Sequence, residues 1–299
     1  MGVSNQGKRG NSLQRMSFHA AIAFLCLLLY LIGSSVELMC LIAIWLKVDW
    51  GTKPELILIG SLGLTDLIGC YGLLVGCLSS LLQNHLHTFI PYLVGLANNI
   101  GWAAGSAHLN ALAVNRFIAV LFPLRYDLLF SGQNTNRLCA YCWLFGGTVA
   151  AGNALLCCPV VYNWTLVTCV YLFPDEPILP EWIRINLFLN LCTMIVPSVC
   201  YLLLTIKLVY LRYHDRDQLS SVDVSLCAQF FVLTLVYNVN ALAWNLVAVL
   251  GDTFWYFSAV TCACYFTVNG YVYLFFNKVI KKAVRELFLT KVAHVQHIN

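Results

Sequence analysis

Long apolar segments separated by short polar stretches dominate the pattern of hydrophobic and polar positions along the chain. Each segment is long enough to cross the ~30 Å hydrocarbon core of a bilayer as an α-helix. The segments lack the alternation of membrane β-strands, and backbone groups in lipid must pair within their own helix. The sequence therefore predicts an all-α membrane protein, a seven-transmembrane helix bundle. Its helices are expected at approximately residues 18–46, 56–82, 89–122, 138–161, 183–211, 224–250 and 253–277.

Composition supports a membrane protein, because hydrophobic residues make up 60% of the chain and charged residues only 10%. Soluble domains carry about 25% charged residues. The net charge of +4 does not indicate a nucleic-acid partner, because the basic residues gather at helix ends. Thirteen of the 17 Lys and Arg residues fall on one side of the predicted bundle. The positive-inside rule assigns that side to the cytoplasm and places the N-terminus outside. The exceptions are Lys8, Arg9, Arg15 and Arg184.

A basic segment follows the last apolar segment, and its hydrophobic positions recur at helical spacing. We expect a short cytoplasmic amphipathic helix on an anionic membrane surface, with an unstructured basic tail as the alternative. The chain then divides into a short extracellular N-terminus (1–17), one transmembrane domain (18–277) and a cytoplasmic helix and tail (278–299). The expected apolar face consists of Val279, Ala283, Leu287 and Phe288, and the basic face of Lys278, Lys281, Lys282 and Arg285.

Residues 115–126 form a motif at the inner end of the third apolar segment. The string Asn-Arg-Phe-Ile-Ala-Val-Leu-Phe-Pro-Leu-Arg-Tyr resembles the end of the third helix in rhodopsin-like G-protein-coupled receptors, Asp-Arg-Tyr-x-Ala-Val-x-x-Pro-Leu-x-Tyr. Asn115 replaces the acid and Phe117 the first tyrosine. The positions that match are Arg116, Ala119, Val120, Pro123, Leu124 and Tyr126.

Further motifs extend the resemblance and narrow it to one branch. Asp66 lies in a string similar to the family's second-helix motif, and Asn269 and Tyr273 lie in Asn-Gly-Tyr-Val-Tyr, similar to its Asn-Pro-x-x-Tyr motif. The sixth segment lacks the family's Trp-x-Pro hinge. The Asn-Arg-Phe string, its continuation through Ser131 and the outer loop ending in Trp182 resemble the nematode serpentine chemoreceptors of class X.

The resemblance implies a contact with the α subunit of a heterotrimeric G-protein through Arg116, Pro123, Leu124 and Tyr273. In most relatives the acid before the arginine holds it back with a salt bridge, which Asn115 cannot form. Either the resting lock is weaker in this chain, or another acid replaces the missing one. The candidates are Asp215, Asp217 and Asp223.

Polar residues inside membrane helices are costly, so each is a functional candidate. Glu37, Asp66 and Asn269 share a depth of about 12–16 Å above the inner helix ends, at ~1.5 Å per residue. We expect them to form a buried polar cluster. In the wider family the second-helix acid binds sodium, but Gly105 and Tyr265 replace two of the usual partners. Protonated, hydrogen-bonded carboxyl groups are the alternative.

The ligand is expected between the helices, in a pocket of aromatic side chains and a few polar groups. Asn98 occupies the position of the acid that holds the ammonium in amine receptors, so amines are not expected. Residues 253–277 contain no Lys, so retinal cannot bind as a Schiff base. The predicted pocket residues are Asn98, Asn99, Trp102, Asn186, Asn190, Trp244 and Asn245.

The outer loops carry two further features. The family's bridge from the outer loop to the third helix cannot form, because Pro91 stands where Cys169 would find its partner; Cys77 is a substitute. The adjacent Cys157 and Cys158 are interpreted as small packing residues. Asn163 begins the sequon Asn-Trp-Thr and is a predicted glycosylation site.

The sequence therefore favours a chemosensory receptor for small environmental molecules over a ligand-gated channel subunit or small transporter. Transporters tend to show paired halves with broken helices, which are not visible here. The sequence shows no Ser/His/Asp set, metal spacing or phosphate loop, so we expect neither an enzyme nor a metal or cofactor. The expected partners are a G-protein α subunit, a small ligand and the bilayer. The plasma membrane is the expected location, and the resemblance implies sensory cilia.

Overall fold

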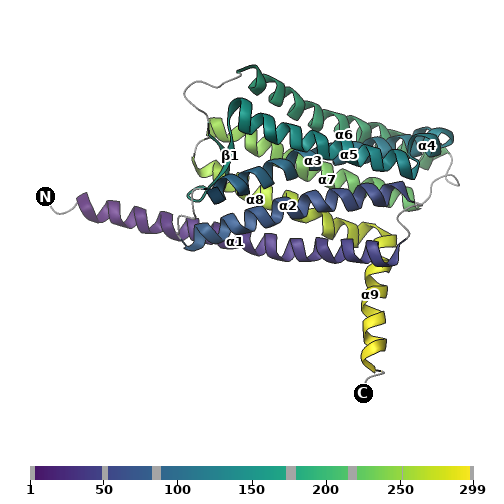
Figure 1. Ribbon diagram of the computed structural model, residues 1–299, viewed down its shortest axis with the longest axis horizontal. Helices are drawn as coiled ribbons and strands as arrows, with labels where there is room; N and C mark the ends of the chain where they lie inside the picture. Colours follow the sequence, from purple (N-terminus) through teal and green to yellow (C-terminus); the bar gives the residue numbers. More distant parts are fainter. Residues whose placement is uncertain are drawn as a thin grey trace.

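The computed structural model describes residues 4–48, 53–82, 89–172, 180–214, 221–250 and 252–296. Its long helices lie side by side in one bundle, while α9 turns away at one end and α1 projects at the other (Figure 1). The helices are α1 (Ser4–Lys47), α2 (Pro54–Leu82), α3 (Phe89–Leu121), α4 (Pro123–Leu129), α5 (Gly132–Gly152), α6 (Pro180–His214), α7 (Ser221–Leu250), α8 (Asp252–Phe276) and α9 (Lys278–Gln296). A π-helical turn, η2 (Asn153–Cys157), and two strands, β1 (Val160–Asn163) and β2 (Thr168–Tyr171), lie between α5 and α6.

The predicted seven-helix bundle is confirmed. Six of the described helices are long and apolar enough to cross a membrane: α1, α2, α5 extended by η2, α6, α7 and α8. The more polar α3 is 33 residues long. It packs against α2, α5, α6 and α7, so the bundle itself surrounds its polar side chains. Asn98, Asn99, His108 and Asn115 on α3 are all buried.

The fourth predicted segment is too long at its outer end. Its helical turns end at Cys157, and a hairpin of β1 and β2 begins at Val160, where the sequence becomes rich in β-branched and aromatic residues. Val160 pairs with Tyr171 and Asn163 with Thr168. The hairpin lies against α3, and the backbone of Val160 occupies the space that a side chain at Gly95 would need.

The predicted amphipathic helix is present as α9, but its buried face differs from the one expected. The Asn277 side-chain oxygen accepts the backbone N–H groups of Val279 and Ile280, each at 3.1 Å, and so caps the helix where it turns away from α8. The helix packs against α1. Its buried residues are Ile280, Ala283 and Val284, whereas Val279 and Phe288 of the expected face are exposed.

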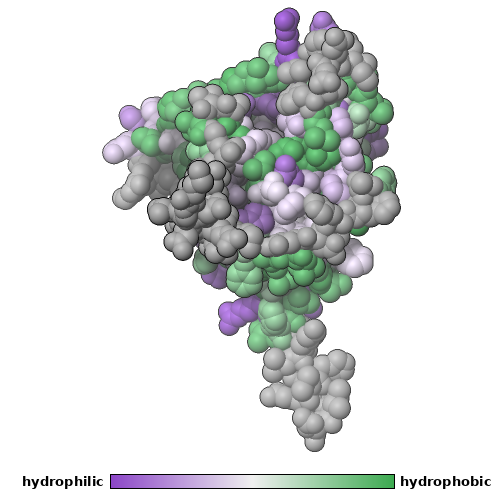
Figure 2. Space-filling view, turned by 90° about the vertical axis from the view of Figure 1, so that its left-hand side faces the viewer, coloured by the Kyte–Doolittle hydropathy of each residue, from purple (hydrophilic) through white to green (hydrophobic). Residues whose placement is uncertain are grey.

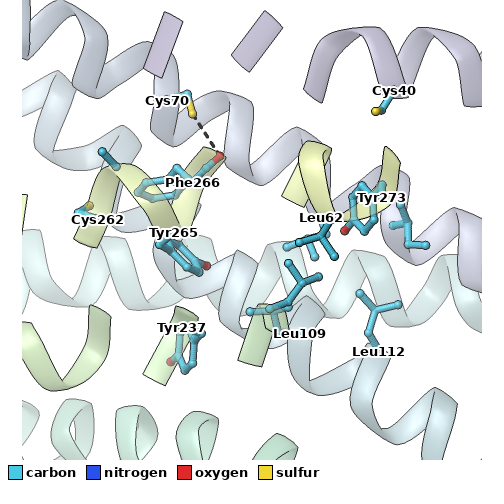
Figure 3. Close-up of a cluster of buried hydrophobic side chains, with 14 of the residues drawn as sticks. Cys40, Leu62, Cys70, Leu109, Leu112, Tyr237, Cys262, Tyr265, Phe266 and Tyr273 are labelled. Atoms are coloured by element: carbon cyan, nitrogen blue, oxygen red, sulfur yellow. Dashed lines mark hydrogen bonds between the residues drawn. The ribbon is translucent and has the colours of Figure 1, made fainter. Parts of the chain in front are cut away.

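Aromatic and aliphatic side chains fill the centre of the bundle. In Figure 3, Tyr265 lies between Phe266 and Tyr237, and Tyr273 lies farther along α8 beside Leu62. Glycines let neighbouring helices approach closely. A Cβ at Gly69 of α2 would collide with the ring of Phe266. In the end view of Figure 2, hydrophilic residues gather toward the middle of the face and hydrophobic residues along the sides.

Candidate functional site

A cavity of about 490 Å³ opens at the end of the bundle that carries the hairpin, which the sequence predicts to face outside and which is called the outer end below. Six of the seven predicted pocket residues line it: Asn98, Asn99, Trp102, Asn190, Trp244 and Asn245. They come from α3, α6 and α7, and none of the described residues that line the cavity is charged. The cavity can therefore surround a neutral molecule with aromatic faces and amide groups.

The hairpin and α8 provide a part of the cavity wall that was not predicted from the sequence. Val160, Val170 and Tyr171 of the hairpin line the cavity together with Trp255 and Cys262 of α8. The short runs of β-branched and aromatic residues at 160–162 and 168–171 were the available signal for strands. Rings from three elements meet here, because Trp244 makes edge contacts with Tyr171 at 6.2 Å and with Trp255 at 6.0 Å between centroids.

Stacked aromatic rings form the inner end of the cavity. Trp102 stacks on Tyr237 with 5.0 Å between centroids and contacts Tyr265 at 5.1 Å. The Tyr237 hydroxyl hydrogen bonds with Thr193 of α6 at 2.6 Å. The Tyr265 hydroxyl lies where a side chain at Gly105 would stand, 2.6 Å from its Cβ position. These rings connect α3, α6, α7 and α8 directly below the cavity.

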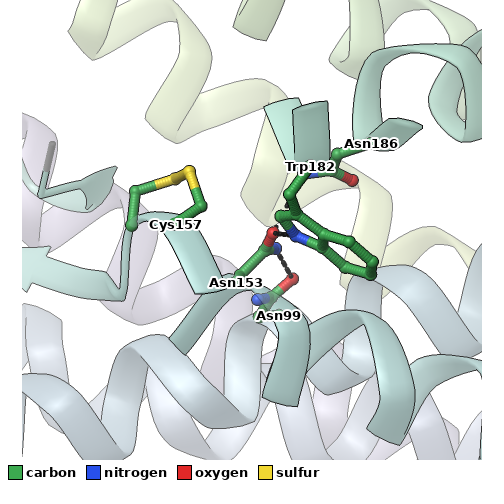
Figure 4. The surroundings of a disulfide bond; sticks show 6 residues. Asn99, Asn153, Cys157, Trp182 and Asn186 are labelled. Carbon is green, nitrogen blue, oxygen red and sulfur yellow. Dashed lines mark hydrogen bonds between the residues drawn. A yellow bond between two sulfur atoms is a disulfide. The ribbon is translucent and has the colours of Figure 1, made fainter. Parts of the chain in front are cut away.

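Asn186, the seventh predicted pocket residue, does not line the cavity and instead belongs to a hydrogen-bond network behind its wall (Figure 4). Its amide nitrogen donates to Asn153 Oδ1 at 3.1 Å, and the Trp182 indole donates to the same oxygen at 2.8 Å. Asn153 Nδ2 donates to Asn99 Oδ1 at 3.4 Å. Burial raises the pKa of the nearby Tyr171 hydroxyl, and a hydrogen bond with Asn186 opposes that shift.

The cysteines at the outer end differ from the expectation. Cys157 and Cys158 form a disulfide with each other at the end of η2, so they are not merely packing residues (Figure 4). Cys169 and the proposed substitute Cys77 are both buried free thiols, and the Tyr162 hydroxyl lies 4.0 Å from the Cys77 sulfur. The adjacent pair stands between the end of η2 and the start of the hairpin.

Deeper in the bundle, Asp66 and Asn269 meet as the shared depth predicts. Asn269 Nδ2 donates to Asp66 Oδ2. Glu37 is buried between Gly63 of α2 and Gly270 of α8, where side chains at either glycine would collide with it. Neither Glu37 oxygen has a hydrogen-bond partner among the described residues. Among all residues that the structure describes, no group of three His, Cys, Asp or Glu side chains could bind a metal ion.

At the inner end, Arg116 is buried and pairs with an acid that the sequence analysis did not consider. Its Nη2 lies 3.7 Å from Glu55 Oε2 of α2. Its guanidinium lies 6.0 Å from the centroid of the Phe230 ring on α7. The earlier candidates Asp215 and Asp217 lie outside the described residues, as does the side chain of Asp223. Asn115 donates to the Tyr126 hydroxyl at 3.1 Å.

The four predicted G-protein contact residues do not share one surface in this conformation. Pro123 and Leu124 on α4 are exposed, and Leu124 is 99% exposed. Tyr273 is completely buried, and Arg116 lies beneath the inner surface. Leu124, Leu128 and Leu129 are the exposed leucines of α4 and form an apolar surface at the inner end of the bundle.

Asn163 lies at the end of β1, where its side-chain oxygen accepts hydrogen bonds from the backbone N–H of Thr165 at 3.0 Å and from the Thr165 hydroxyl at 2.6 Å. The rest of the turn is anchored to the bundle, because His19 Nε2 and the Ser80 hydroxyl bond with the Trp164 carbonyl at 2.8 and 2.9 Å. The sequon thus stands in a turn at the outer end.

The comparisons with known proteins agree with this geometry. A family model described as serpentine type 7TM GPCR chemoreceptor Srx matches residues 27–277, which include the outer cavity, the Asp66–Asn269 pair and Arg116. No curated protein matches the chain. The match spans most of the sequence and names a family of receptors rather than of enzymes. Together with the helical membrane bundle, it shows that the chain belongs to the Srx family of serpentine seven-transmembrane chemoreceptors, the class X receptors that its motifs resemble.

Proposed function

We propose that this receptor binds a small neutral molecule in the outer cavity and signals through the α subunit of a heterotrimeric G-protein. The cavity carries this proposal, because amide and aromatic side chains surround about 490 Å³ among the outer helix ends without a charged group among the described lining residues. An ion would lose its hydration there without gaining a partner of opposite charge. A neutral molecule would gain aromatic contacts and hydrogen bonds.

The two ends of α7 provide a physical connection between the ligand and the inner surface. Trp244 near its outer end lines the cavity, and Phe230 near its inner end lies over the Arg116 guanidinium. Between them, Tyr237 stacks on Trp102 of α3. A ligand that shifts the Trp102–Tyr237 contact would move α7 relative to α3 and thereby uncover Arg116.

Arg116, Pro123, Leu124 and Tyr273 remain the proposed G-protein contact. The exposed Leu124 and Pro123 offer a docking point in the present conformation, whereas Arg116 and Tyr273 become available only after the inner ends separate. The buried cluster of Glu37, Asp66 and Asn269 joins α1, α2 and α8, and its polar contacts would change when α8 shifts. We place the receptor in the plasma membrane of sensory cells, including their cilia, with its N-terminus outside.

The test combines a cell assay with a reconstituted one. Cells that express the receptor are imaged for calcium across a panel of volatile and water-soluble odorants, and active compounds are then tested for nucleotide exchange with purified G-protein. Trp244→Ala should abolish both ligand binding and signalling. Leu124→Ala should reduce nucleotide exchange and leave ligand binding unchanged. Ligand-gated current in a bilayer free of G-proteins would replace the receptor mechanism with the channel alternative.

A further inference from the structure

The Trp182 indole fixes the orientation of two hydrogen-bonded asparagine side chains, Asn153 and Asn99, the second of which lies in the cavity wall. An indole N–H can only donate a hydrogen bond, so the atom of Asn153 that it meets at 2.8 Å must be the carbonyl oxygen. The Asn186 amide nitrogen supports this assignment by donating to the same oxygen at 3.1 Å. Asn153 must therefore turn its amide nitrogen toward Asn99 (Figure 4).

The hydrogen bond from Asn153 also fixes the orientation of the Asn99 amide. Its carbonyl oxygen accepts from Asn153 Nδ2 at 3.4 Å, and its amide nitrogen has no hydrogen-bond partner among the described residues. Asn99 lines the cavity. The preceding residue, Asn98, also lines the cavity, and its Oδ1 lies 3.9 Å from the Cys262 thiol, a weak contact. The α3 wall therefore presents an amide donor at Asn99, whose carbonyl oxygen faces Asn153, and Asn98 stands beside it.

We propose that the ligand is a neutral molecule with a carbonyl oxygen, such as a ketone, ester or lactone, and that the amide groups of Asn99 and Asn98 bind this oxygen. This inference rests on the proposed function and specifies the ligand class of the same cavity. A carbonyl oxygen has two lone pairs and can accept from both amides. A hydroxyl oxygen can also accept, but its own proton then needs an acceptor other than these two amide nitrogens, and an unpaired O–H group is costly.

Local features keep the chain of amides in place. Gly152 lets the Trp182 ring lie against the end of α5, since a Cβ there would lie 2.6 Å from ring carbons. The π-helical turn η2 begins with Asn153 and carries this side chain at the junction of α3, α5 and α6. Asn153 is almost completely buried, so water does not compete for its amide.

The experiment measures ligand affinity on the purified receptor in nanodiscs, through quenching of tryptophan fluorescence, without any G-protein. The probes come in sets of three compounds with the same carbon skeleton: a ketone, the corresponding secondary alcohol and the hydrocarbon. For the wild type we expect the ketone of the best skeleton to bind about ten-fold tighter than the hydrocarbon, the ratio that ~1.4 kcal/mol gives. The alcohol should bind more weakly than the ketone.

Two variants distinguish the effect of the Asn99 amide orientation on ligand binding from the effect of side-chain packing around the cavity. Asn99→Asp keeps the shape and replaces the donor with oxygen, so it should remove the preference for the ketone. Trp182→Phe removes the indole donor and part of the ring, and leaves Asn186 as the remaining donor to Asn153. The orientation of Asn153 and Asn99 is then held less firmly, so the preference for the ketone over the alcohol should shrink. Trp143→Phe is the matched control, because its indole donates at 2.9 Å to Ser61, away from the cavity, and the ketone preference should persist.

Equal affinity for the ketone and the hydrocarbon in the wild type would overturn the inference, as would the absence of binding by every carbonyl compound. An unchanged ketone preference in Asn99→Asp would overturn it even if Trp182→Phe failed to fold. A receptor that shows the predicted binding pattern but drives no nucleotide exchange would support the ligand class and refute the proposed coupling.

Discussion

Arg116 on α3 forms its ion pair with Glu55 in the first turn of α2, and not with a residue of its own helix. The two side chains are 9% and 25% exposed, and their closest charged atoms are 3.7 Å apart. The adjacent position holds Asn115, which bonds with Tyr126 instead. Arg116 must leave Glu55 before it can reach a partner at the inner surface, so the pair opposes activation.

Glu55→Gln should therefore raise ligand-independent nucleotide exchange. A partly exposed pair is worth ~1 kcal/mol, which corresponds to a rise of about five-fold. Exchange is measured with the purified receptor and G-protein. Glu286→Gln is the matched control, because it removes an acid from the exposed Lys282–Glu286 pair of α9 and should leave basal exchange unchanged. Equal basal rates in wild type and Glu55→Gln would refute the lock.

Asn115→Asp should lower basal exchange, because it places a second acid next to Arg116. Its carboxylate can also accept from the Tyr126 hydroxyl, the present partner of the Asn115 amide. In the Glu55→Gln background the same change should bring basal exchange back toward the wild-type rate, again by an amount of ~1 kcal/mol. A double variant as active as Glu55→Gln alone would mean that residue 115 cannot hold Arg116.

Asn163 should carry an N-linked glycan when the receptor is made in cells. The sequon lies in the turn at the outer end, with Asn163 partly exposed and Thr165 exposed. Glycosidase treatment should increase gel mobility of the wild type and leave Asn163→Gln unchanged. A shift that persists in Asn163→Gln would assign the glycan elsewhere. A C-terminal tag that can be stained on intact cells would contradict the orientation of the whole bundle.

Patterns within one segment predicted much of the structure. The lengths of the apolar segments predicted the helices. Counting residues from the inner helix ends placed Asp66 and Asn269 at the same depth, and the two side chains share a hydrogen bond in the structure. Helical positions near the outer ends also identified six residues of the cavity wall. These inferences needed only that each helix crosses the bilayer.

Contacts that depend on how distant segments meet could not be predicted in this way. Glu55 lies in a different helix from Arg116, and only the packing of α2 on α3 brings them together. Asn153 appeared to be one more residue of an apolar segment, although it connects Asn99 with Trp182. On α9, two faces have helical spacing, and the turn at Asn277 decides which of them meets α1.

Gly270→Ala should destabilise the receptor, because α8 approaches α1 closely at this glycine. A Cβ would lie 2.9 Å from the backbone nitrogen and 3.0 Å from the Cα of Glu37. Overpacking of this kind costs about 1–3 kcal/mol. Thermal unfolding in detergent measures the effect. Gly147→Ala is the control, since a Cβ there meets nothing within 4 Å and should leave the unfolding temperature unchanged. Equal unfolding temperatures for the two variants would contradict the close approach.

Arg116→Ala tests the coupling mechanism directly. Arg116 lies at a helix end but is buried. Its removal leaves the Glu55 carboxylate without its ion-pair partner. The Glu55 side chain is 25% exposed and can be hydrated, so we expect the variant to reach the cell surface. Ligand binding in the outer cavity should persist, because Arg116 is not among the residues that line it.

Ligand-driven nucleotide exchange should be lost in Arg116→Ala, because the contact of Arg116 with the α subunit is made only after Arg116 has left Glu55. Arg137→Ala removes an exposed arginine near the start of α5 and should retain most of the signal. Surface labelling, ligand binding and nucleotide exchange are measured on the same preparations. If Arg116→Ala reaches the surface, binds ligand and drives exchange at the wild-type rate, Arg116 is not the coupling residue, and the exposed Leu124 would have to carry the contact without it.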